Sequence, residues 1–87
     1  MPRYLAVHTL PDVTEEGFRE MLRGGRPEGP PGVEWKLTYC AFDDHQYFCE
    51  WQAPDKATLQ RLFEERKTPF TAIHEVQLLD WKTKTLE

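Results

Sequence analysis

The chain has 87 residues and a net charge of −4, and its 11 Lys and Arg residues are scattered along its length. This length allows one modest hydrophobic core, so we expect a single domain over residues 1–87. No basic stripe that would bind a phosphate backbone is present, which argues against a nucleic-acid partner. The apolar N-terminal segment is short and interrupted by His8, so we expect no membrane span or signal peptide and a cytoplasmic protein.

The first third of the chain predicts a strand, a helix and a loop. Residues 4–10 are short, apolar and β-forming, which predicts a strand. Thr14 precedes two acids and can cap a helix, and three apolar residues then follow helical spacing: Phe18, Met21 and Leu22. Residues 23–32 contain four glycines and three prolines, which predicts a loop.

The remaining residues predict two strands, a second helix and a last strand. In the strand over 33–42, alternation places Trp35, Leu37 and Tyr39 on one face. Acids at 43 and 44 mark a turn before the returning strand over 46–53, and Asp55 can cap the helix that follows. Residues 72–81 predict the last strand, and the polar residues 82–87 are expected to fray.

The order strand, helix, strand, strand, helix, strand predicts an α+β domain of the ferredoxin-like type, with an antiparallel sheet of order 4-1-3-2. A different small α+β arrangement is the alternative. Aromatic residues are expected on both sheet faces, yet two helices cover only one. The uncovered face favours a homodimer packed through the sheet, and a ligand cleft or half-exposed aromatic side chains are the other readings.

Chemically reactive side chains are expected to converge at one end of this sheet, because the first strand ends there beside the starts of the third and fourth. Only some of them can share a face. The residues expected at this end are His8, Tyr39, Cys40, Asp43, Asp44, His45, Cys49 and His74.

Both cysteines, Cys40 and Cys49, lie on the predicted hairpin. A two- or four-residue loop centred between Asp44 and His45 would place them directly opposite each other, which would allow a disulfide. In a reducing cytoplasm, two reduced thiols that pack as small hydrophobes are favoured over metal ligation, and a disulfide comes last. The spacing around His45 matches no standard zinc motif.

Two kinds of chemistry remain open for the convergent residues. His8 and His74 are expected to meet across the first and fourth strands, where imidazoles assisted by a thiol or a turn acid would suit nickel, copper or zinc. His45 is expected to be either a solvated turn residue or a further ligand. Glu50, expected opposite Tyr39, would be either an acid–base group or simply a hydrogen-bonded carboxyl.

Several short segments resemble a small bacterial family, most of whose members are labelled only as domains of unknown function. These segments are residues 1–5 with His8, residues 33–35 through Tyr39, residues 47–55 and residues 73–78. The family includes a nickel-binding, nickel-responsive protein, so the resemblance implies a ferredoxin-like dimer and nickel binding. The chain departs from the family at Gln52, Leu37 and Phe63, where members often carry Glu or His. His8 is the best-matched ligand that remains.

Three functions are therefore compared. The first is a small metal-binding protein for sequestration or response, with nickel as the first metal. The second is an enzyme of the dimeric α+β barrel type, a cofactor-free monooxygenase or isomerase, with a small-molecule substrate and with Glu50, Tyr39 or His8 as the acid–base group. The third is an interaction module without a site.

Overall fold

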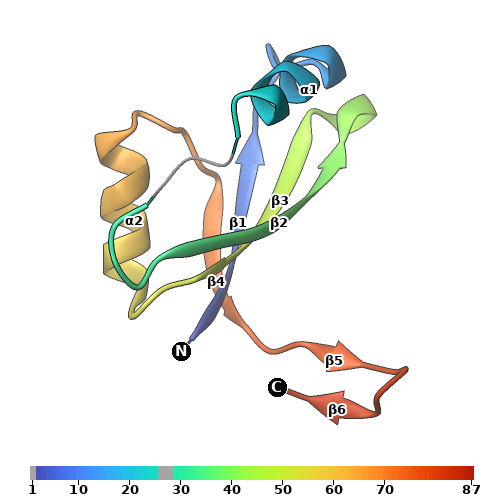
Figure 1. Ribbon diagram of the computed structural model, residues 1–87, viewed down its shortest axis with the longest axis vertical. Helices are drawn as coiled ribbons and strands as arrows, with labels where there is room; N and C mark the ends of the chain where they lie inside the picture. Colours follow the sequence, from blue (N-terminus) through green and yellow to red (C-terminus); the bar gives the residue numbers. More distant parts are fainter. Residues whose placement is uncertain (1, 26–28) are drawn as a thin grey trace.

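A computed structural model describes residues 2–25 and 29–87 (Figure 1). The predicted order of elements is confirmed, and part of the predicted loop, residues 26–28, lies outside the described residues. In chain order the elements are β1 (Arg3–Thr9), α1 (Glu15–Arg23), β2 (Glu34–Ala41), the 3-10 turn η1 (Phe42–Asp44), β3 (Gln46–Gln52), α2 (Lys56–Glu65), β4 (Ala72–Val76), β5 (Leu79–Asp80) and β6 (Thr85–Leu86).

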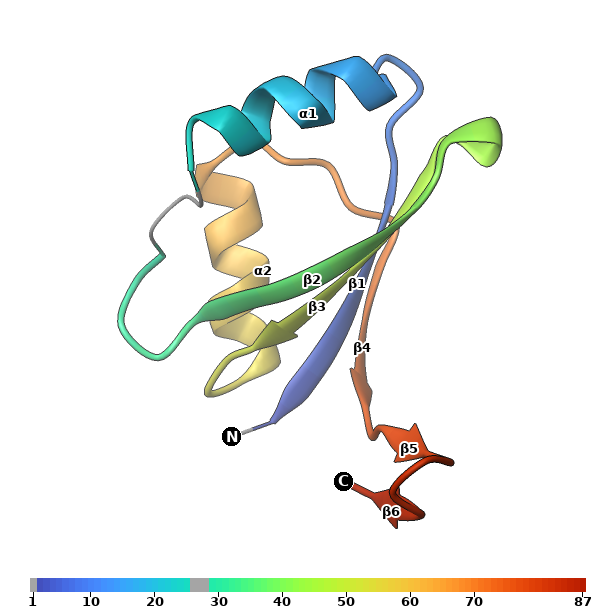
Figure 2. The same ribbon diagram turned by 45° about the vertical axis from the view of Figure 1, so that its right-hand side comes forward.

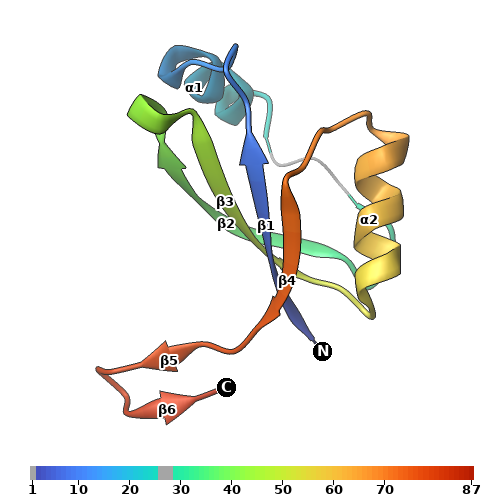
Figure 3. The same cartoon turned by 180° about the vertical axis from the view of Figure 1, so that it is seen from behind.

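The first four strands form one antiparallel sheet in the order β2-β3-β1-β4, as the ferredoxin-like topology predicts. Residues from both helices border the same face of this sheet, which we call the helix face. The opposite face, the open face, carries no helix of the described residues (Figures 1 and 3). Neither α1 nor α2 is long and apolar enough to cross a membrane, within the part of the chain that the structure describes.

Both predicted helix caps are confirmed. The hydroxyl of Thr14 accepts a hydrogen bond from the backbone N–H of Gly17 at 3.0 Å. The carboxylate of Asp55 accepts one from the backbone N–H of Thr58 at 2.7 Å. Each cap satisfies a donor that the first turn of a helix leaves without a partner.

The two helices contribute unequally to the core. α2 buries three side chains against the strands, whereas α1 buries none and leaves Leu22 74 % exposed. Figure 2 shows α1 crossing one end of the sheet, while α2 runs alongside the strands. The buried cluster comprises Tyr4, Ala6, Cys49, Trp51, Ala53, Leu59, Leu62, Phe63 and Ile73. Because α1 stays out of it, space remains between α1 and the sheet.

A β-bulge changes the predicted faces of β2. The register shifts between Trp35 and Leu37, so that Lys36 is the extra residue and Trp35 lies opposite Trp51. The two indole rings stack at 5.5 Å with an interplanar angle of 10°. The prediction that Trp35 shares a face with Leu37 is therefore wrong, because an inserted residue reverses the alternation on one side of it.

The C-terminal part of the chain also differs from the prediction. β4 ends at Val76, which lies opposite Arg3, the first residue of β1. Residues 79–86 instead form a hairpin closed by backbone hydrogen bonds between Leu78 and Glu87, so they do not fray. All three views show this hairpin projecting from the sheet, and Trp81 within it is 81 % exposed (Figures 1–3).

Candidate functional site: a cavity between the helices and the sheet

The β2–β3 hairpin places Cys40 opposite Tyr47 and Cys49 opposite Thr38. Ala41 pairs with Gln46, so the loop holds the four residues 42–45 and is centred between positions 43 and 44. This centre lies one residue before the predicted one, which moves every pairing by two residues. The loop centre that would have placed Cys40 opposite Cys49 is therefore not the one that the structure has. Both cysteines are free thiols, with Cys40 exposed and Cys49 buried.

The sheet separates the predicted site residues. His8, Cys40 and Cys49 belong to the helix face, whereas Tyr39, Glu50 and His74 belong to the open face. His74 lies opposite Leu5, whose side chain points away from the helices as the neighbouring Tyr4 points toward them. Leu5 precedes His8 by three residues in β1, so the side chains of His8 and His74 lie on opposite faces of the sheet. The predicted meeting of these two histidines is therefore wrong.

The turn residue His45 stays apart from both groups. It has φ = 55° and an exposed side chain, and its carbonyl accepts a hydrogen bond from the N–H of Leu10 at 2.9 Å. This bond confirms that the end of β1 lies beside the start of β3. The acids Asp43 and Asp44 of the same turn are also exposed.

His8 is buried at this end of the sheet, with 4 % of its surface exposed. Its Nδ1 lies 2.7 Å from the carbonyl oxygen of Pro69, and its ring packs edge-on against Phe63 at 5.1 Å. A carbonyl can only accept, so Nδ1 carries the hydrogen and Nε2 holds a lone pair in the neutral ring. Histidines that bind metals or act as bases are commonly oriented in this way.

Cys49 belongs to a short chain of hydrogen bonds. The indole N–H of Trp35 donates to the hydroxyl of Thr38 at 2.8 Å, and this hydroxyl donates to the Sγ of Cys49 at 3.2 Å. Burial raises the pKa of the Cys49 thiol, the bond from Thr38 lowers it and the nearby Cys40 raises it, with a net upward shift. A thiol of this kind is a poor nucleophile and a poor metal ligand at neutral pH.

A cavity of about 500 Å³ lies between α1, α2 and the helix face of the sheet. His8 and Cys49 line its wall together with the aromatic side chains of Phe18, Trp35, Tyr47, Trp51 and Phe63. The hydroxyl of Tyr47 is already engaged, since it donates to the carbonyl of Val13 at 3.4 Å. The exposed wall of the cavity is mainly apolar, although Asp12 and Arg66 of opposite charge also line it. A mainly apolar wall with a few polar groups is the usual character of small-molecule sites.

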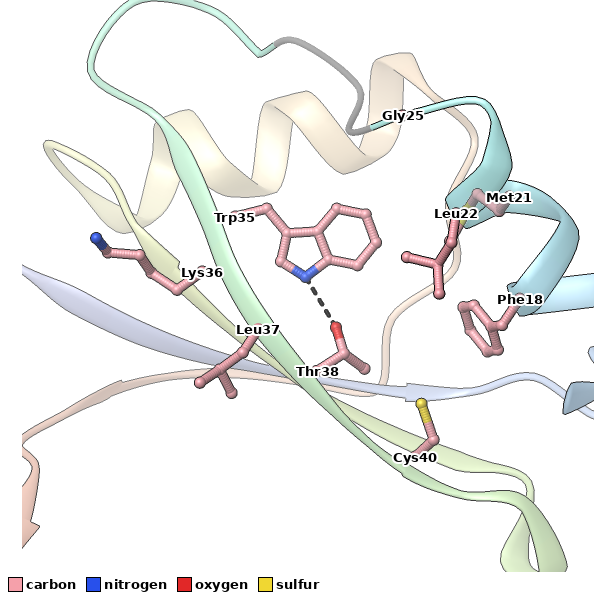
Figure 4. Close-up of a pocket in the computed structure, with 9 residues that line it drawn as sticks. All are labelled: Phe18, Met21, Leu22, Gly25, Trp35, Lys36, Leu37, Thr38 and Cys40. Atoms are coloured by element: carbon pink, nitrogen blue, oxygen red, sulfur yellow. Dashed lines mark hydrogen bonds between the residues drawn. The ribbon is translucent and has the colours of Figure 1, made fainter.

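A second, smaller hollow of about 320 Å³ adjoins this cavity on the side of β2, and Figure 4 shows its lining. The Trp35 ring lies between β2 and α1, facing Leu22 and Phe18, with its N–H bonded to Thr38. Trp35 and Thr38 border both spaces. Sequence reasoning missed both residues, and a Thr beside the predicted cysteine pair was the available signal for Thr38.

The predicted acid–base pair is not formed on the open face. Glu50 lies opposite Leu37 rather than Tyr39, and its Oε2 is 3.4 Å from the Nε of Arg3. Tyr39 lies opposite Phe48 and is 66 % exposed. Neither residue lines the cavity on the helix face. The loop between β2 and β3 is centred one residue earlier than expected, so Glu50 does not lie opposite Tyr39.

Within one chain, the residues that the structure describes do not bring together a complete set of nickel ligands. No group of three or more His, Cys, Asp or Glu side chains that could hold a metal ion occurs among residues 2–25 and 29–87. The helix face brings His8 and Cys49 to one cavity wall, but the shifted pKa of Cys49 opposes the thiolate form.

One of the comparisons with known proteins agrees with the sequence resemblance. A family model described as "Nickel responsive protein SCO4226-like" matches residues 4–76, from β1 to the end of β4. Searches of curated proteins and of solved structures found no match. The match covers both helices and all of the four-stranded sheet except Arg3, and the chain therefore belongs to the SCO4226-like family of nickel responsive proteins.

Proposed function

We propose that this protein acts in the cytoplasm as a small binding protein of a nickel response and that His8 is its contact with the metal. The supporting observation is the hydrogen bond from His8 Nδ1 to the carbonyl of Pro69, which leaves Nε2 as the basic nitrogen beside the cavity. Neutral imidazole is a good ligand for nickel, copper and zinc.

The proposed binding is weak, which suits a response to the metal better than its long-term storage. A single chain offers one well-prepared nitrogen and a thiol whose raised pKa disfavours coordination. Solvent would complete the coordination shell, because the dimer proposed below packs through the open face and His8 lies on the helix face. Family membership favours nickel over the other late first-row ions.

Calorimetry of tag-free protein with Ni²⁺ at pH 7.5 tests this proposal. His8→Gln should lose most of the binding heat, whereas His74→Gln, on the exposed edge strand, should retain it. Equal affinities for the wild type and His8→Gln, or no heat with either, would exclude His8 as the metal contact.

We also propose that the protein is a homodimer whose two copies pack through their open faces. The apolar residues of this face are Leu5, Val7, Leu37, Tyr39, Phe48 and Val76, and together they extend across all four strands. The projecting β5–β6 hairpin adds exposed apolar side chains at Leu79, Trp81 and Leu86. Covering this much apolar surface favours association, and an isologous dimer is the commonest solution.

Light scattering during gel filtration measures the mass directly. The chain has a mass of 10.3 kDa, so a dimer should elute at twice this value. A mass of one chain at micromolar concentration would contradict the proposed dimer.

A further inference from the structure

The cavity on the helix face has the size and walls of a site for a small aromatic compound. Its volume of about 500 Å³ falls within the range of small-molecule sites. Its walls include two stacked indoles, Trp35 and Trp51, and the rings of Phe18 and Phe63. Flat aromatic surfaces favour a flat aromatic ligand, because offset and edge-on ring contacts add to the burial of apolar area.

The packing of α1 leaves this space unfilled. Phe18 and Met21 of α1 line the cavity, yet α1 buries no residue and Met21 is 40 % exposed. Native interiors are normally close-packed, and an open apolar cavity forgoes the contacts that its walls could make. A bound molecule would supply these contacts from both sides.

The polar groups of the cavity wall that are not already hydrogen-bonded indicate which polar group a ligand should carry. The hydroxyl of Thr38 already accepts from Trp35 and donates to Cys49, and the hydroxyl of Tyr47 donates to Val13. His8 differs from these two hydroxyls, because no hydrogen bond to its Nε2 is found among the described residues. The indole N–H of Trp51, another wall residue, is buried and also has no hydrogen-bond partner among them. Nε2 is an acceptor in the neutral ring, so a complementary ligand must donate a hydrogen bond.

From these observations we infer that the cavity binds a neutral, planar aromatic compound with one hydroxyl group, a phenol of one or two fused rings. The ring system lies among Phe18, Trp35, Trp51 and Phe63, and the hydroxyl donates to Nε2 of His8. This inference goes beyond the nickel role proposed above and needs no metal.

The three tryptophans provide an internal control for the experiment. The probe is 2-naphthol, added to ¹⁵N-labelled protein in the presence of EDTA at pH 7.5, and the indole N–H resonances are followed by NMR. The resonances of Trp35 and Trp51 should shift in a saturable way. The resonance of Trp81 should stay in place, because Trp81 lies on the projecting hairpin.

Two variants and a matched ligand separate the hydrogen bond from simple burial. His8→Phe should weaken 2-naphthol binding by about tenfold, the value of one hydrogen bond. It should leave the binding of 2-methoxynaphthalene, which lacks the donor, unchanged. Met21→Trp should fill the cavity and reduce the binding of both compounds.

Three results would overturn the inference. The first is that no indole N–H resonance shifts in a saturable way up to millimolar 2-naphthol. The second is that the Trp81 resonance shifts as much as those of Trp35 and Trp51. The third is that the wild type and Met21→Trp bind 2-naphthol with equal affinity. A correctly folded His8→Phe protein that binds both compounds as the wild type does would remove the hydroxyl contact. Because EDTA is present, a failure of nickel binding leaves these outcomes unaffected, and the two proposals are tested separately.

Discussion

The Nδ1 of His8 lies 2.7 Å from the carbonyl oxygen of Pro69, which joins the end of β1 to the segment before β4. The two residues are 61 positions apart, and the imidazole is almost fully buried. One hydrogen bond therefore orients the ring, fixes its tautomer and holds two distant segments together.

Removing this bond should destabilise the fold. His8→Phe keeps most of the buried ring but leaves the Pro69 carbonyl without its partner, so we expect a loss of about 1–3 kcal/mol in the free energy of unfolding. Urea titration followed by circular dichroism measures it. His74→Gln, at an exposed position, is the control and should change the value by about 0.5 kcal/mol or less. Equal stabilities of the two variants would contradict the structural role of His8.

The two thiols should differ in reactivity. Partial burial raises the pKa of the Cys40 thiol, and deeper burial raises the pKa of the Cys49 thiol. Cys40 nevertheless remains exposed to reagents, whereas Cys49 is buried. In native protein at pH 8, we expect Cys40 to react with a thiol reagent about tenfold faster or more than Cys49, and both to react after unfolding. Cys40→Ser isolates the slow phase. A disulfide would appear instead as missing thiols in the unfolded protein.

The hydroxyl of Thr38 should affect this slow phase. Its hydrogen bond to Cys49 lowers the thiol pKa, so Thr38→Val should raise that pKa further and reduce the thiolate fraction at pH 8. The reaction of Cys49 in the Cys40→Ser background should then become slower. Thr83→Val, on the projecting hairpin, is the control. An unchanged rate in Thr38→Val would show that this bond does not control the thiol.

The cap of α2 predicts a pH dependence of stability. Hydrogen bonds from the side chain and the backbone N–H of Thr58 hold the pKa of Asp55 below its ordinary value. A carboxyl with a lowered folded-state pKa stabilises the fold above its unfolded-state pKa, and this stabilisation is lost as the pH falls through the folded-state value.

Asp55→Asn keeps an acceptor at the cap but does not titrate, so it isolates this effect. We expect the wild type to be more stable than Asp55→Asn at pH 7, and the difference to shrink as the pH falls below about 4. Urea titrations at pH 7, 4 and 3 measure the difference. A difference that is the same at all three values would contradict the pKa shift.

The open face should control the oligomeric state. Tyr39→Glu places a charge at the centre of the proposed interface, and we expect it to convert the dimer into a 10.3 kDa monomer. Leu22→Glu changes a comparably exposed apolar residue on α1 and should leave the dimer intact. Light scattering distinguishes the two masses. Dissociation by Leu22→Glu alone would place the interface on α1 instead.

The bulge in β2 makes a prediction about deletions. Lys36 is the extra residue, so its deletion should keep Trp35 opposite Trp51 and change the free energy of unfolding by about 1 kcal/mol or less. Deletion of Thr38 instead forces a shift of register that moves core side chains to the other face, and should cost about 3 kcal/mol or more. Near-UV circular dichroism of the stacked indoles and urea titration measure both effects.

The local pattern of the sequence was sufficient for the order of the elements from β1 to β4 and for both helix caps. Thr14 and Asp55 each act on N–H groups within the next three residues, so their role depends on nothing distant. The alternation of apolar residues in β1 and β3, and the spacing in α2, likewise express the geometry of a single element. The sequence resemblance predicted the nickel responsive family, which the comparison confirmed.

The tertiary structure alone decided which reactive side chains meet. The bulge that turns Trp35 toward Trp51, and the loop centre that places Cys49 opposite Thr38, depend on pairing between strands. A change of one residue in such a pairing reverses a face, and no local pattern specifies it. The separation of His8 from His74, the bond of His8 to Pro69 and the cavity beneath α1 follow from the same cause: they depend on contacts between segments far apart in the chain.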